Sequence, residues 1–126
     1  MAEASELDRF AATLMRRVRD RAVHECDRLA SGTAVGPSAE YWRDLLDDRA
    51  RRIVTMLVPS IVDQVLFELL DAIDNGDLDL AWRQADGSFV PLGDLGLGEM
   101  AGWLVGSQDS WRLRFSAERS HDPLIP

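Results

Sequence analysis

The apolar residues of the first 75 positions recur with the spacing of an α-helix, and this pattern then stops. At 100° per residue, the apolar side chains gather on one face in each of three segments, residues 5–30, 38–58 and 59–75. Pro59 favours a break between the second and third segments, because proline cannot continue an undisturbed helix but suits the first turn of a new one. The sequence therefore predicts three helices.

After Gly76 the pattern changes from helical to alternating. Leu78, Leu80 and Trp82 alternate with polar or small residues, and Asp86-Gly87 is a turn signal. We expect a β-hairpin over about residues 78–91. Two strands alone are only marginally stable, so this hairpin must lie on the helices or pair with another chain.

The last third of the chain is rich in glycine and aromatic residues. We expect a helical segment over about residues 98–117 and a tail at residues 120–126. The length of 126 residues fits a single domain. The predicted fold is α+β and mainly α, with a three-helix body, a β-hairpin and a short C-terminal helix.

Charge is divided unequally between the two halves of the chain. Residues 1–58 hold ten arginines and ten acidic residues, whereas residues 59–126 hold four arginines and twelve acidic residues, which gives the whole net charge of −8. Between Asp63 and Asp109, Arg83 is the only base among ten carboxylates. Such a field favours a basic partner and repels nucleic acid.

We predict that the acidic side of the helix at 59–75 and the start of the hairpin bind a basic protein. Phe67 projects about 150° from the centre of the apolar stripe, into a ring of acids, like an interface aromatic inside a polar rim. Two alternatives are that the acids only solvate the surface and that the hairpin covers Phe67. The predicted partner-binding residues are Asp63, Phe67, Asp71, Asp74, Asp77, Asp79 and Trp82.

Arg49 interrupts the apolar stripe of the segment at 38–58, between Leu45 and Ile53. A buried guanidinium must be paired, because the desolvation of a lone charge is very costly. We expect a structural ion pair with Glu99 or Asp94 from the glycine-rich segment. The alternative is that Arg49 extends into solvent from the edge of the stripe.

Three patterns that would signal a cofactor or catalysis are incomplete. An EF-hand would need oxygen ligands at Ile73 and Trp82, and the dinucleotide-like glycines of residues 96–101 lack a preceding buried strand. His24 and Cys26 diverge on a helix and have no third partner nearby. We expect no cofactor, no metal site and no catalytic residue.

In size, acidity and lack of motifs the chain resembles the small acidic immunity proteins that neutralise bacterial toxins, many by masking a basic active-site cleft. The resemblance implies a non-enzymatic inhibitor with a basic partner such as a toxin, and it carries over no individual residue. One alternative is a self-associating structural or regulatory subunit, such as a homodimer. The other is a small enzyme with Glu99 and Arg49 in a pocket.

The composition also predicts the compartment. The N-terminus is acidic and polar, no window approaches the roughly 18 apolar residues of a membrane span, and the single cysteine fits a reducing cytosol. We expect a cytoplasmic protein with neither a membrane nor a nucleic acid as its partner.

Overall fold

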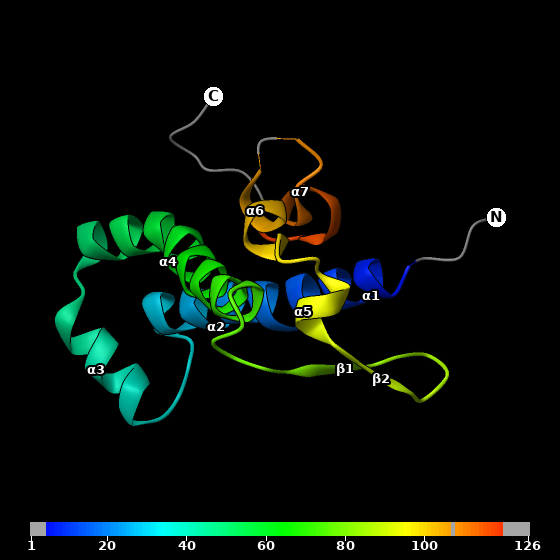
Figure 1. Cartoon of the computed structure of the whole chain (residues 1–126). Helices are drawn as coiled ribbons and strands as arrows, with labels where there is room; N and C mark the ends of the chain where they lie inside the picture. The colour runs from blue at the N-terminus through cyan, green and yellow to red at the C-terminus, as the bar shows by residue number, and fades with distance from the viewer. Residues whose placement is uncertain (1–4, 107, 120–126) are drawn as a thin grey trace.

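The computed structural model describes residues 5–106 and 108–119, and it is mainly helical with one antiparallel hairpin (Figure 1). This confirms the predicted fold class. The elements in chain order are α1 (Glu6–Thr13), a π-helix (Leu14–Arg19), α2 (Asp20–Ser31), α3 (Pro37–Leu45), α4 (Asp48–Asp74), β1 (Ala81–Arg83), β2 (Phe89–Pro91), α5 (Leu92–Leu95), α6 (Met100–Val105) and α7 (Trp111–Phe115).

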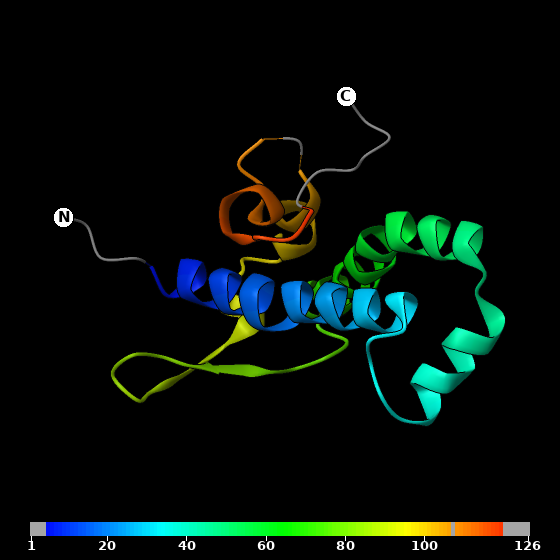
Figure 2. The same cartoon turned by 180° about the vertical axis from the view of Figure 1, so that it is seen from behind.

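The first helix, the π-helix and α2 form one continuous rod (Figure 2). Ser5 caps its start by accepting a hydrogen bond from the amide of Asp8 at 3.0 Å, and Gly32 ends it in the left-handed region at φ 80°. The π-helix adds a residue to one turn, which rotates the buried face by about 100°. Val18, which regular helical spacing places on the apolar face, is therefore 46% exposed, and Arg19 is buried in its place.

The predicted break at Pro59 is wrong, because α4 continues through it. The chain breaks earlier, between α3 and α4, where Asp47 caps α4 by accepting a hydrogen bond from the amide of Ala50 at 2.8 Å. The predicted helix at 38–58 therefore consists of α3 and the first part of α4.

The structure compensates for the amide hydrogen that Pro59 lacks. In a regular helix that amide would donate to the carbonyl of Thr55, four residues earlier. Here Arg119 donates to the Thr55 carbonyl at 2.6 Å, and its other terminal nitrogen donates to both carboxylate oxygens of Asp27 at 2.7 and 2.8 Å. A residue near the C-terminus thus supports the middle of α4.

We predict that Arg119→Ala lowers the free energy of unfolding more in the wild-type protein than in a protein that already carries Pro59→Ala. In the variant the new amide of residue 59 can donate to the Thr55 carbonyl, so the carbonyl keeps a partner when Arg119 is lost. Urea unfolding of the four proteins of the double-mutant cycle should give a coupling of about 1 kcal/mol. Purely additive effects would contradict this role of Arg119.

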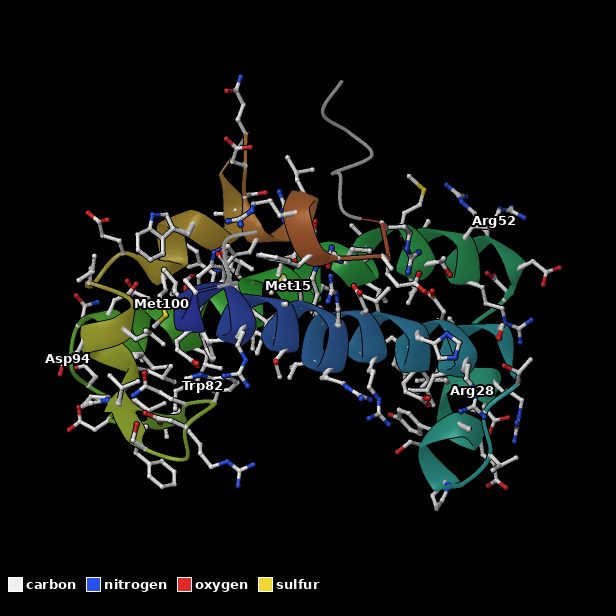
Figure 3. All side chains as sticks on the ribbon, turned by 90° about the vertical axis from the view of Figure 1, so that its right-hand side faces the viewer. Met15, Arg28, Arg52, Trp82, Asp94 and Met100 are labelled. Atoms are coloured by element: carbon white, nitrogen blue, oxygen red, sulfur yellow. The ribbon has the colours of Figure 1, made fainter. Side chains whose placement is uncertain are left out.

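The core is centred on the C-terminal half of α4. Its largest cluster combines Phe10, Met15, Leu70, Met100 and Trp111 from the rod, α4, α6 and α7. Figure 3 shows Met15 and Met100 where these helices meet. The first half of α4 extends beyond this cluster, which leaves one of its faces without a covering element.

This uncovered face is apolar, and we call it the α4 ridge. Its side chains are between 47% and 65% exposed, although their helical spacing predicts a core stripe. The prediction that they are buried is wrong, because no other described element packs on that side of α4. The α4 ridge consists of Ile53, Met56, Leu57, Ile61 and Val65.

The expectation that no segment reaches the length and hydropathy of a membrane span is also wrong. Helix α4 is long and apolar enough by length and composition, with a mean hydropathy of 1.8 over 18 residues, of which 28% are buried. Most of that window is therefore exposed on the surface of the protein.

The hairpin is shorter than predicted but lies where the alternation placed it. Trp82 pairs with Val90, and Gly87 forms the turn at φ 89°. Trp82 packs edge-on against Phe10 of α1, with ring centroids 5.5 Å apart, so the hairpin lies on the helices.

The predicted helical segment at 98–117 is divided into α6 and α7. Ser110 starts α7 by accepting a hydrogen bond from the amide of Leu113 at 3.3 Å. The predicted tail at 120–126 lies outside the described residues.

A buried ion-pair network joins the rod, α4 and the C-terminal segment. Arg19 is fully buried, and its Nε and Nη2 donate to the two carboxylate oxygens of Asp63 at 2.6 and 3.3 Å. Arg112 also donates to Asp63, at 2.9 Å. Asp20 accepts hydrogen bonds from Ser116 Oγ and the Ala117 amide, both at 2.8 Å.

Arg19→Ala should destabilise the protein by about 3–5 kcal/mol, because it leaves the buried Asp63 with only one cationic partner. Arg17→Ala on the exposed side of the same rod is the matched control and should change the free energy of unfolding by less than about 0.5 kcal/mol. Equal effects of the two substitutions in urea unfolding would rule out the network as a major source of stability.

Candidate functional site

Three aspartates, the exposed Asp79 and Asp94 and the half-buried Asp74, line a cleft between the end of α4, the hairpin and α5. The cleft has a volume of about 490 Å³. It is lined by Ile73, Asp74, Gly76, Asp79, Leu80, Pro91, Gly93 and Asp94.

The end of α4 shapes one wall of this acidic cleft. Gly76 adopts φ 77°, and its amide donates to the carbonyl of Ile73 at 3.1 Å. The amides of Asp77 and Leu78 both donate to the carbonyl of Ala72, at 2.9 and 3.1 Å. The chain therefore reverses sharply and brings Asp77 and the start of the hairpin beside the helix end.

A backbone hydrogen bond closes the opposite wall. The amide of Leu92, which is buried in the core, donates to the carbonyl of Leu80 at 2.8 Å. This bond holds the start of α5 against the strand that precedes the turn. Asp94 on α5 is thereby placed at the same cleft as Asp79.

Asp74 has a structural role as well as a place in the cleft. Its carboxylate oxygens accept hydrogen bonds from the amides of Met100 and Ala101, at 3.1 and 2.9 Å. These amides lie in the first turn of α6 and lack partners within the helix. Asp74 therefore fixes α6 to the end of α4, and its oxygens are partly used within the protein.

The other acids of this region are free to meet a ligand. Asp77, Asp79 and Asp94 are exposed, and within residues 5–106 and 108–119 their carboxylates accept no hydrogen bond. Asp71 is half-buried. The described residues contain no group of three or more metal-ligating side chains placed to hold a metal ion. The cleft instead offers carboxylates beside apolar walls.

Two of the predicted partner-binding residues are less exposed than predicted. Asp63 is only 5% exposed and is paired with Arg19 and Arg112, so its placement on a docking surface is wrong. Phe67 is half-buried, packs against the core cluster and lines a separate surface cleft with Gln64 and Arg112. Neither Asp63 nor Phe67 lines the acidic cleft.

Trp82 is half-buried between the hairpin and the rod. Its indole Nε1 donates to Glu6 at 2.9 Å, and Arg9 lies 5.8 Å from the ring centroid. The hydrogen bond from Trp82 is the main reason that the pKa of Glu6 lies below its ordinary value, with further contributions from the Ala85 amide and Arg9. Trp82 thus connects the hairpin to the start of α1.

We predict that Trp82→Phe raises the pKa of Glu6 towards its ordinary value, because the substitution removes the donor. The low folded-state pKa means that this bond stabilises the protein above the unfolded-state pKa and that the benefit is lost as the pH falls through the folded-state pKa. NMR titration of the Glu6 carboxyl measures the change. An unchanged Glu6 pKa in the variant would show that the hydrogen bond is not its cause.

The expected ion pair between Arg49 and Glu99 or Asp94 is not formed. All three residues are exposed, and the ion pairs found within the described ranges do not join Arg49 to either acid. Figure 3 shows the neighbouring Arg52 and the cleft residue Asp94 at opposite ends of the molecule. The buried, paired arginine is instead Arg19. Regular helical spacing does not place Arg19 on the buried face, because the π-helix rotates it there.

Cys26 and His24 differ in their exposure to solvent. His24 is exposed, whereas Cys26 is half-buried and its pKa is raised, first by burial and then by Asp27 and Glu25. The sulfur is therefore a neutral thiol at neutral pH. Since the thiolate is the reactive form, this environment disfavours nucleophilic chemistry at Cys26.

Comparison of this chain with protein-family models, with curated proteins and with solved structures finds no match.

Proposed function

We propose that this protein is a non-enzymatic protein-binding module that receives a basic partner at its acidic cleft. The observation that carries the proposal is the pairing of exposed carboxylates with apolar walls at one site. Asp79 and Asp94 lie beside Leu80 and Pro91 in the cleft. This combination suits an arginine or lysine side chain, whose stem is apolar and whose head is cationic.

The charge distribution supports a basic partner. Between Asp71 and Glu99 the chain has seven acidic residues and one arginine. Arg28 and Arg52 lie at the opposite end of the molecule from Asp94 (Figure 3). A molecule that is polarised in this way attracts and orients a cationic surface before contact.

The module is similar in size and charge to immunity proteins, and we extend the proposal to an inhibitor that masks a basic cleft in the cytoplasm of a bacterium. The contact residues are Asp77, Asp79 and Asp94, with Asp71 and Asp74 contributing charge behind them. We assign neither Asp63 nor Phe67 to this contact, because Asp63 is buried and Phe67 packs against the core cluster.

An NMR titration with a short arginine peptide tests the cleft directly. We expect the amide signals of residues 74–80 and 92–94 to shift, and the binding to weaken with salt. Asp79→Asn with Asp94→Asn should weaken binding roughly tenfold, because two charge contacts of up to about 1 kcal/mol each are lost.

The matched control is Glu40→Gln with Asp44→Asn, since both residues are exposed on α3 and the change in net charge is the same. This control should leave binding within about twofold if the cleft is the site. Equal weakening in both pairs would mean that only net charge matters. Shifts that avoid the cleft would contradict the proposal.

A further inference from the structure

The α4 ridge belongs to a longer exposed strip of one helix. Between Arg49 and Glu68, two neighbouring residues are exposed at every fourth position, for example 52 and 53, then 56 and 57. These positions form one strip that winds slowly around the helix. The aliphatic α4 ridge occupies its middle. When i±3 rows of one helix pack into the i±4 grooves of another, the axes cross at only about 20°, so two helices stay in contact along their length.

The two ends of the strip carry opposite charges. Arg49 and Arg52 lie at its N-terminal end, and Gln64 and Glu68 lie at its C-terminal end. The Glu68 carboxylate accepts a hydrogen bond from Gln64 at 3.0 Å, and within the described residues no arginine pairs with it. The strip is therefore basic, then apolar, then acidic along the helix.

When two copies of the strip run antiparallel, the basic end of each copy lies opposite the acidic end of the other. An antiparallel helix pair centred between Val58 and Pro59 places position 49 of one chain opposite position 68 of the other. Arg49 then meets Glu68 of the second copy at both ends, Met56 meets Ile61, and Leu57 and Ile53 meet the exposed Ser60 and Gln64. Val58 and Pro59 themselves are buried against the protein's own core, so they do not obstruct the contact.

We propose that the α4 ridge is the interface of a homodimer, in which two copies of α4 pack antiparallel around a two-fold axis. Each copy contributes the same patch, as such an interface requires. The acidic cleft lies beyond the end of the strip, so it points away from the interface on each copy. This inference does not depend on the proposed function.

A second copy fits the strip better than a lipid surface does. Anionic lipid would attract Arg49 and Arg52 but repel Glu68, and the net charge of −8 opposes approach to an acidic membrane. Pairing with a second copy satisfies both ends of the strip at once. It also separates the two acidic clefts, which limits the repulsion between the copies.

The first experiment measures mass by light scattering over a range of concentrations. The wild type should reach twice the monomer mass, and Leu57→Asp in the centre of the α4 ridge should remain a monomer. Val35→Asp is the matched control, because Val35 is 88% exposed in the loop between α2 and α3, and this variant should still dimerise. Circular dichroism checks that each variant is folded.

The second experiment exchanges the charges. Arg49→Glu should weaken the dimer roughly two- to thirtyfold, because each dimer loses two exposed pairs. Adding Glu68→Arg should restore most of the affinity, whereas Arg21→Glu on the exposed side of α2 should have little effect. Restoration by the second charge is specific to an antiparallel pair.

Three results in the mass measurements would overturn the inference. They are a wild type that stays monomeric up to its solubility limit, a mass above two copies, and a dimer that survives Leu57→Asp. A two-fold interface closes on itself, so it cannot produce larger assemblies. A monomer that cosediments with anionic vesicles would assign the α4 ridge to a lipid surface and would also overturn the inference.

Discussion

The buried ion pair between Arg19 and Asp63 is the interaction on which the arrangement of this protein depends. A guanidinium with no access to solvent needs carboxylate and carbonyl partners on every side. Arg19 finds them on α4, in its neighbour Asp20 and in the segment after α7. The rod, α4 and the C-terminal segment are therefore held at one point that tolerates little displacement.

This constraint determines which surfaces remain open. The core and the Arg19 network lie along the second half of α4, and Arg119 from the same C-terminal segment reaches back to Thr55. The first half of α4 receives no cover on its outer side, which exposes the α4 ridge. At the other end, the reversal at Gly76 and the cap that Asp74 provides for α6 create the acidic cleft. Two surfaces of different chemistry thus lie at different ends of one helix.

Local signals in the sequence predicted the features that depend on neighbouring residues. The helical spacing over residues 5–30 and the Asp86-Gly87 turn correctly indicated the rod and the hairpin. Long-range features escaped prediction. Pro59 lies within a helix because Arg119 supplies a donor 64 positions from Thr55, and no local pattern indicates that contact.

The sequence predicted that the candidate site would be acidic, but it identified only some of the residues that line it. The run of acids after residue 70 indicated where negative charge would gather, and Asp74 and Asp79 do line the cleft. Asp63 follows the same pattern but turns inward, because the π-helix rotates Arg19 to a position that requires a carboxylate from α4. The extra residue per turn of the π-helix buries Arg19, and Arg19 in turn pairs with Asp63, 44 positions away in the chain.

Hydrogen exchange at the arginine side chains tests this central claim most directly. In two-dimensional NMR spectra, the Nε proton of Arg19 should exchange with solvent only when the core opens, at rates near those of the slowest backbone amides. The Nε proton of exposed Arg17 should exchange without protection. Equally fast exchange at both arginines would mean that Arg19 reaches water and that the buried network does not hold the fold together.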